Sequence, residues 1–147
     1  MVAKAIERLA ILVDIIPQKL STINDVDFSK KSSPDKWSKK EILGHLIDSA
    51  ANNHQRFIRS QFEDSPTIGY DQNQWVENSY YHDSDTHQLI TFWTAYNQFL
   101  ISIMKSISSE KLVKTCTMKD GTLLTIEFLI ADYVNHLEHH LKQIMRY

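Results

Sequence analysis

Apolar residues recur along the chain at intervals of three and four positions in four long stretches, the spacing of amphipathic helices. The first stretch runs from Val2 to Ile16, and Pro17 is predicted to stop or kink it because proline lacks an amide hydrogen and clashes with the preceding turn. The second stretch follows Ser38-Lys39-Lys40-Glu41, a sequence typical of a capping box, and reaches about Phe62. We predict a helix over each of these stretches.

The third stretch opens near Asp83 to Asp85, whose negative charges suit the positive end of a helix dipole. Its apolar positions are Leu89, Phe92, Trp93, Tyr96, Leu100, Ile103, Met104 and Ile107. The fourth stretch runs from about Ile126 to Met145, and its apolar stripe is centred near Leu137. Both are predicted to be helices, and the aromatic row of the third suits either the core or a homodimer face.

Polar and irregular segments connect the predicted helices. Residues 21–36 are polar and predict a loop between the first two helices. Residues 63–83 contain a proline, a glycine and several Asp and Asn, and predict a long crossover between the second and third helices. Trp75, Tyr80 and Tyr81 indicate that this crossover packs onto the rest of the chain.

Turn-forming residues are scarce in this sequence of 147 residues, which has three Gly and three Pro. So few turn signals argue against a sheet-rich fold, although Lys119-Asp120-Gly121 predicts a small hairpin from residues 112–117 and 122–125. The 42% of hydrophobic residues are enough to bury a core. We therefore predict one all-α domain over residues 1–147, a four-helix bundle with a long crossover between its second and third helices.

The charge balance limits the possible partners. Sixteen Lys and Arg against eighteen Asp and Glu give a net charge of -2, and no dense basic run is present, so nucleic acid is not a predicted partner. Apolar runs are far shorter than the ~20 residues of a membrane-spanning helix, and the N-terminus lacks the zones of a signal peptide. The lone Cys116, expected to be buried, fits a reducing compartment, so we expect no membrane association and a cytoplasmic location.

Three of the seven histidines, His136, His139 and His140, lie within one five-residue segment of the fourth predicted helix. Residues four apart lie on one face of a helix, so His136 and His140 can present two imidazoles to one ion. With successive residues turned by about 100°, His140 lies roughly 60° from the centre of the apolar stripe, His136 roughly 100° and His139 roughly 160°. The spacing therefore favours His136 and His140 as a metal pair over His139, with ordinary surface or capping histidines as the alternative.

A third ligand must come from elsewhere in the chain. The candidates are His45, His54, His82 and His87. The apolar stripe of the second helix is centred close to His54, which predicts His54 as the inward residue, although a single inward histidine is more often a core side chain than a ligand. His45 lies off the stripe, beside Asp48 and Asn52. Polar neighbours of this kind are found around metal ligands and also on a solvated helix face. Periodicity alone leaves the third ligand open.

Two motifs resemble one known family. Residues Trp37 to Asp48 are similar to the W-x-x-x-E-[IL]-[LA]-x-H-L-x-D opening of the DinB-like superfamily, which includes YfiT-like metal-dependent hydrolases. Residues His136 to Ile144 are similar to the H-x-x-H-H-x-x-Q-I ending of that family. Both motifs occur in the family's order and separation, and the resemblance covers roughly Ala5 to Ile144.

The resemblance implies a four-helix bundle that holds a metal through His45, His136 and His140. It leaves His54 either a packing role or a role in supporting the metal ligands. Three neutral imidazoles leave a divalent ion with an open position for water or substrate, as in catalytic sites. We expect one divalent transition metal, zinc or nickel before copper or iron, because imidazole ligands suit these ions. Asp48, one turn from His45, is the expected carboxylate that orients a ligand or acts as a base.

The resemblance also implies two kinds of activity on a small-molecule substrate. The first is metal-dependent hydrolysis, and the second is a transferase reaction that uses a low-molecular-weight thiol. An alternative from another class is a stress-related metal-binding protein or dimeric scaffold without turnover. A third alternative is a metal-free helical interaction module.

Overall fold

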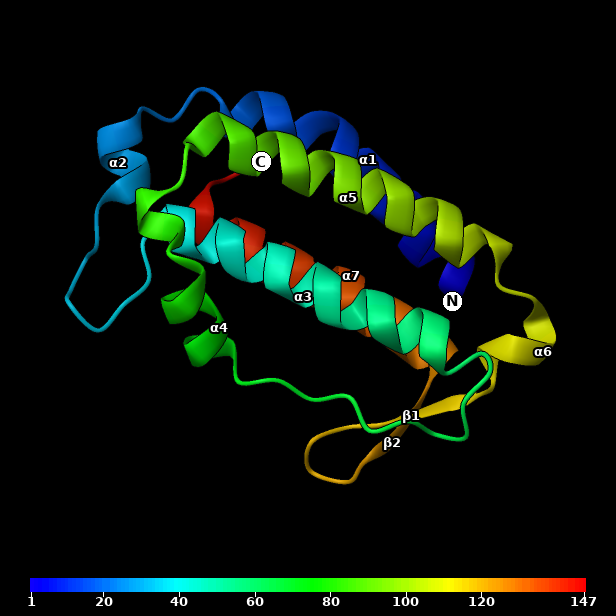
Figure 1. Ribbon diagram of the computed structural model, residues 1–147. Coiled ribbons are helices and arrows are strands. Elements are labelled where there is room, and N and C mark those ends of the chain that lie inside the picture. The colour runs from blue at the N-terminus through cyan, green and yellow to red at the C-terminus, as the bar shows by residue number, and fades with distance from the viewer.

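Four long helices lie side by side in the computed structural model, which describes residues 1–147 (Figure 1). They are α1 (Val2–Leu20), α3 (Lys39–Arg59), α5 (Thr86–Ser106) and α7 (Ile126–Ile144). Each of α1 and α3 packs against both α5 and α7, so α1 and α3 lie at opposite corners of the bundle. The predicted all-α four-helix bundle is confirmed, and none of its helices combines the length and hydropathy needed to span a membrane.

Shorter elements join the long helices. They are α2 (Asp25–Ser29), α4 (Gln72–Ser79), the 3-10 helix η1 (Tyr81–Asp83), α6 (Ser109–Leu112), β1 (Thr115–Thr117) and β2 (Leu123–Thr125). The strands β1 and β2 pair antiparallel, with Cys116 opposite Leu124, so the predicted hairpin is confirmed. Cys116 is fully buried, as expected.

The predicted helix starts coincide with side-chain caps. At α3 the hydroxyl of Ser38 accepts a hydrogen bond from the amide of Glu41, and the Glu41 carboxylate accepts one from the amide of Ser38, which completes the capping box. Asp85 caps α5 by accepting from the amide of Gln88, and Thr125 caps α7 in the same way. These caps satisfy amides that have no partner within the helix.

At the N-terminal end, the predicted stop at Pro17 and the predicted continuous loop after it are wrong. The helix α1 continues through Pro17 to Leu20, because the proline removes only one intrahelical hydrogen bond while Ile16 and Leu20 are fully buried. The predicted loop over residues 21–36 contains α2, which Asn24 caps and whose Phe28 is fully buried. A single buried aromatic residue in a polar stretch was too weak a pattern to predict this short helix.

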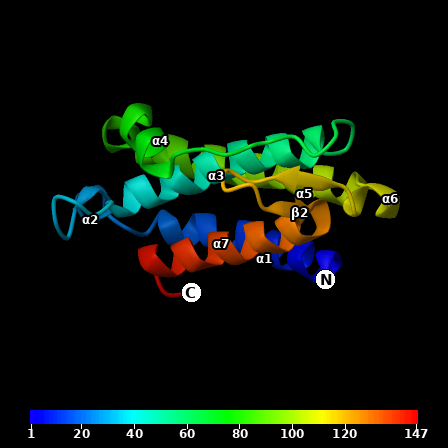
Figure 2. The same cartoon turned by 90° about the horizontal axis from the view of Figure 1, so that it is seen from below.

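The crossover between α3 and α5 runs lengthwise beside α3 (Figures 1 and 2). Both α4 and η1 pack against α3, and the backbone of Ile68 pairs with Thr117 of the hairpin. The packing predicted from its aromatic residues holds for Tyr81, whereas Trp75 and Tyr80 are exposed. The crossover therefore covers a second face of α3, in addition to the face that α3 buries in the bundle.

Candidate metal centre

Three histidine side chains meet between α3 and α7. His45 comes from α3, His136 and His140 come from successive turns of α7, and their ligand atoms all lie within 4.8 Å of one another. Nε2 of His45 lies 3.2 Å from Nε2 of His136. The ring of His45 has its centre 4.7 Å from that of His140. The structure thus brings together the three histidines that the family resemblance implied.

The other candidate histidines lie elsewhere. His54 is half-buried against α5, where its Nδ1 lies 3.0 Å from the hydroxyl of Tyr96, so it turns only partly inward. His139 is exposed, as its angle on the helix predicted. His82 and His87 are outside the cluster.

His45 is fully buried although it lies off the apolar stripe of α3. Its neighbours on the same side of the helix, Asp48 and Asn52, are also buried. The covering is supplied by α7 and by the crossover, and the ring of Trp37 lies 4.9 Å from that of His45. A polar face buried in this way can hold a ligand set that water does not reach freely.

Burial also sets the charge state of the histidines. Desolvation, followed by the neighbouring imidazoles, lowers the pKa of His45 to about 3, and burial lowers that of His136 to about 4. Burial lowers the pKa of His140 as well, although its hydrogen bond to Gln143 acts in the opposite direction. At neutral pH all three rings are therefore neutral and offer nitrogen lone pairs.

The arrangement fits a divalent transition metal. Two Nε2 atoms that face each other at 3.2 Å can share at most one proton, and a cation between the rings would satisfy both lone pairs. Nδ1 of His45 is buried and has no hydrogen-bond partner. Three neutral imidazoles are the ligand set of open zinc sites, and they also suit nickel.

A carboxylate lies one turn further along α3. Oδ1 of Asp48 accepts a hydrogen bond from the phenol of Tyr81 at 2.5 Å, whereas Oδ2 is buried without a partner. Burial raises the pKa of Asp48 to about 6, and the bond from Tyr81 partly offsets that rise. Asp48 is therefore mostly ionised at neutral pH and keeps one oxygen free to accept a proton.

Gln143 fixes the orientation of His140. Its Oε1 lies 2.8 Å from Nδ1 of His140, and its Nε2 lies 3.2 Å from Nε2 of His139. With Oε1 as the acceptor, Nδ1 of His140 carries the proton and Nε2 keeps its lone pair toward the cluster. Gln143 therefore contacts the cluster directly, whereas Asp48 lies one turn from His45 on α3 and is bound by Tyr81.

Two residues at the site escaped the sequence analysis. Trp37 is named in the sequence only as the first residue of the family motif, whereas in the structure its ring lies against that of His45. Tyr81 was predicted only to pack, and nothing in the local pattern connects it to Asp48. The one available signal was Gly44, whose missing side chain leaves the space that the Tyr81 ring occupies.

Comparisons with known proteins agree with this architecture. Residues 12–144 match the sequence profile of the DinB superfamily. A protein of Halalkalibacterium halodurans named "Putative metal-dependent hydrolase" is 23% identical over 126 residues, which are 85% of this chain and 73% of the relative. A relative from Oceanobacillus iheyensis with the same description is 24% identical over 132 residues, which are 86% of this chain and 73% of the relative.

Solved structures share the fold. YfiT from Bacillus subtilis, described as "a probable metal-dependent hydrolase with an unusual four-helix bundle topology", superposes with a TM-score of 0.88 at 21% identity, covering 97% of this chain and 83% of YfiT. A mycothiol-dependent maleylpyruvate isomerase superposes with a TM-score of 0.77 at 10% identity, covering 96% of this chain and 60% of the isomerase. The profile match spans nearly the whole sequence, and on that ground the chain belongs to the DinB superfamily.

Proposed function

We propose that His45, His136 and His140 bind one divalent transition metal, zinc or nickel, and that the protein is a metal-dependent hydrolase acting on a small molecule. The observation that carries this proposal is the convergence of three neutral ring nitrogens within 4.8 Å of one another. One of the three, on His45, lies one turn of α3 from the buried carboxylate of Asp48. The descriptions of the relatives as metal-dependent hydrolases support the same chemistry.

When bound, the ion supplies Lewis acidity, which polarises a carbonyl group and favours the ionisation of water or a thiol. The chain supplies the remaining functions. Asp48 accepts a proton at Oδ2, and Tyr81 holds that carboxylate in place through Oδ1. Gln143 holds His140 in one tautomer, and Trp37 shields the ring of His45 from water.

Elemental analysis of protein purified without a histidine tag tests the metal site. We expect one metal per chain in the wild type and its loss in His45→Ala and His136→Ala. His54→Ala is the matched control, because His54 lies on the same helix and binds Tyr96 instead. Loss of metal only in the His54 variant, or its full retention in His45→Ala, would contradict the assignment.

A thiol-dependent transferase is the second candidate. The shared fold with a mycothiol-dependent isomerase favours it, because a metal that ionises water also ionises a low-molecular-weight thiol. Metal-dependent turnover on a panel of esters and amides, compared with a thiol-transfer panel, separates the two reactions. A protein that retains metal but is silent in both panels would favour the stress-related metal-binding or scaffold alternative.

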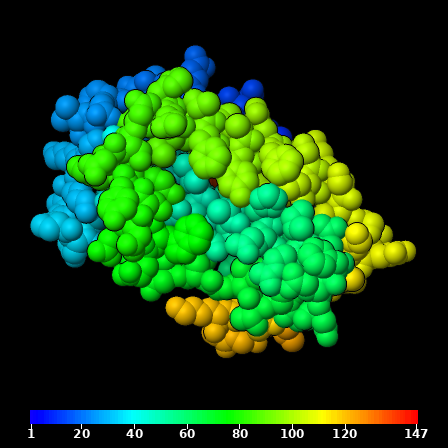
Figure 3. All heavy atoms as spheres, in the orientation of Figure 1, coloured from blue at the N-terminus to red at the C-terminus, as the bar shows by residue number.

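We also propose that the protein forms a homodimer through the outer face of α5. Phe92 and Phe99 are 51% and 54% exposed, and the ring of Phe92 stacks on that of Tyr96 (this face of the molecule is seen in Figure 3). Exposed aromatic residues that gather on one helix are typical of protein interfaces. Sedimentation equilibrium should give twice the chain mass for the wild type and the single mass for Phe92→Ser/Phe99→Ser; a monomeric wild type would contradict the proposal.

A further inference from the structure

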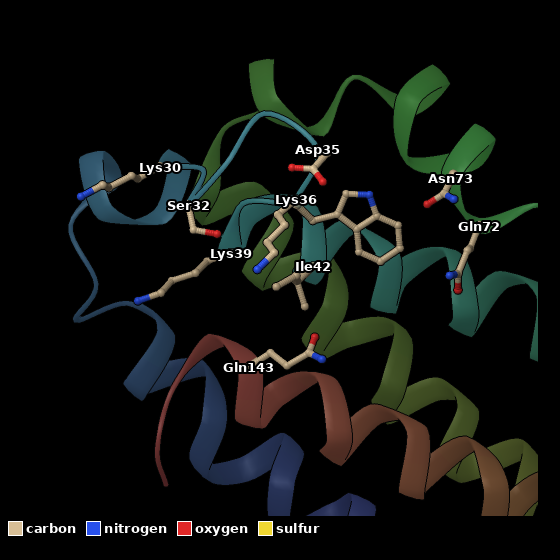
Figure 4. A pocket seen from close by; sticks show the side chains of 10 residues that line it. Lys30, Ser32, Asp35, Lys36, Lys39, Ile42, Gln72, Asn73 and Gln143 are labelled. Carbon is tan, nitrogen blue, oxygen red and sulfur yellow. The ribbon is translucent and has the colours of Figure 1, made fainter.

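A pocket of about 620 Å³ opens next to Trp37 and Gln143, which contact His45 and His140. It lies between the α2–α3 connection, the first turns of α3 and α4, and the last turn of α7 (Figure 4). Its lining residues are Lys30, Ser32, Asp35, Lys36, Trp37, Lys39, Ile42, Gln72, Asn73 and Gln143. Eight of the ten are polar or charged, which indicates a ligand that forms hydrogen bonds and ion pairs rather than an apolar one.

The pocket shares a wall with the candidate metal centre. Trp37 lines the pocket, and its ring lies 4.9 Å from that of His45. Gln143 also lines the pocket, and its Oε1 contacts Nδ1 of His140. A molecule in this pocket therefore touches residues that contact two of the three histidines directly.

The pocket is lined by more basic than acidic residues, whereas the chain as a whole has a net charge of -2. Lys30, Lys36 and Lys39 line it together with one acidic residue, Asp35, whose carboxylate accepts a hydrogen bond from Ser33. None of these three lysines has a carboxylate within 4.0 Å, whereas the adjacent Lys31 pairs with Glu41 and Lys40 with Asp25. Unpaired cations in a pocket attract an anionic ligand.

The pocket also contains neutral side-chain amides that have no hydrogen-bond partner in the protein. The side-chain amides of Gln72 and Asn73 form no hydrogen bond within the chain, although Gln74 and Asn78 of the same helix do. Both residues lie in the first turn of α4, and Lys39 begins α3, so the positive ends of two helix dipoles also lie at the pocket. The amides can donate to or accept from polar groups of a bound molecule.

We propose that this pocket binds the carboxylate or phosphate group of an anionic small-molecule substrate and so holds its reacting part toward the three histidines. The pocket selects acids over neutral molecules of the same size. The assignment of this ligand as a substrate rests on the proposed enzymatic function, whereas anion binding in the pocket does not depend on it.

Nuclear magnetic resonance titration of the isotope-labelled full chain tests the proposal. The probes are glutarate for a carboxylate, inorganic phosphate for a phosphate, and glutaramide as the neutral match for glutarate, with the indole N–H of Trp37 as the reporter. We expect saturable chemical-shift changes of this resonance with at least one anion and none with glutaramide. The anion that binds more tightly shows whether the pocket prefers a carboxylate or a phosphate group. The affinity should fall as salt is raised, because partly exposed charges are screened.

Substitution of the three lysines supplies the decisive comparison. Lys30→Gln/Lys36→Gln/Lys39→Gln should weaken anion binding by about tenfold, since each exposed ion pair contributes a few-fold. Lys31→Gln, a neighbouring lysine that pairs with Glu41 outside the pocket, is the matched control and should bind normally. Equal affinity in the triple variant, equal binding of glutaramide, or no saturable shift in the wild type would overturn the proposal.

His45→Ala separates this proposal from the metal assignment. We expect the variant to lose metal and to keep anion binding, because the pocket lysines do not contact His45. Anion binding lost with the metal would place the anion on the metal and overturn the pocket assignment. If the wild type holds no metal but still binds the anion, the result would support the anion-binding pocket and contradict the proposed metal-dependent enzymatic function.

Discussion

The phenol of Tyr81 donates a hydrogen bond to Oδ1 of Asp48 at 2.5 Å and so ties the crossover to α3, one turn beyond His45. The two residues are 33 positions apart, and the bond is part-buried. It occupies one carboxylate oxygen and leaves Oδ2 free. The crossover therefore contributes to the chemistry of the site as well as covering it.

Tyr81→Phe tests whether Asp48 acts as the base. The phenol's bond lowers the pKa of Asp48, so its loss should raise that pKa above about 6. The acidic limb of the pH-rate profile should then move to higher pH, with little change in KM. Tyr80→Phe is the control, because Tyr80 is exposed; an unmoved limb in Tyr81→Phe would argue against Asp48 as the base.

Gly44→Ala should displace Tyr81. A Cβ at residue 44 would lie 2.1 Å from Cδ2 of the Tyr81 ring, far inside contact distance. We expect an overpacking cost of about 1–3 kcal/mol in the free energy of unfolding, which exceeds the gain of up to about 1 kcal/mol in helix propensity. In a Tyr81→Ala background the clash is absent, and Gly44→Ala should become neutral or stabilising. Chemical denaturation of the four proteins measures this coupling, and equal costs in both backgrounds would contradict it.

Local patterns predicted much of this molecule because the features concerned are local. The capping box at Ser38 and the pairing of His136 with His140 depend on residues within one or two turns of a helix. The structure confirms the cap, and it places the two histidines of α7 together. The polarity of a single helix face was enough to exclude His139.

The choice between His45 and His54 could not be made in this way. Periodicity assumes that a helix buries one face, and α3 buries a second face beneath the crossover. The path of a long irregular connection depends on tertiary contacts, such as the bond of Ile68 to Thr117, that leave no periodic pattern. For the same reason Tyr81 could not be connected to Asp48 from the sequence, and His45 was implied only by the family resemblance.

The metal-free protein should lose stability in acid through its histidines. Burial lowers the pKa of His45 to about 3 and that of His136 to about 4, whereas both are near 6.5 in the unfolded chain. Between about pH 6.5 and 4 the unfolded chain therefore binds protons that the folded chain does not, so the free energy of unfolding falls as pH falls.

Asp48 acts in the opposite direction, because its raised pKa makes the folded chain bind a proton that the unfolded chain releases. The comparison must therefore be made between proteins that both contain Asp48. Thermal unfolding in a chelator from pH 4 to 7 should show a weaker pH dependence for His45→Gln than for the wild type. Parallel curves would show that His45 is not held neutral in the folded chain.

Gln143 should control metal affinity without being a ligand. Its Oε1 accepts from Nδ1 of His140 and thereby leaves Nε2 as the nitrogen that faces the cluster. Gln143→Leu removes the acceptor, and both tautomers of His140 then become accessible, so zinc affinity measured against a chromophoric chelator should fall by about 10–100-fold. Gln143→Glu keeps an acceptor oxygen and should retain most of the affinity. A role in packing alone predicts no such difference, because leucine would then be tolerated as well as glutamate.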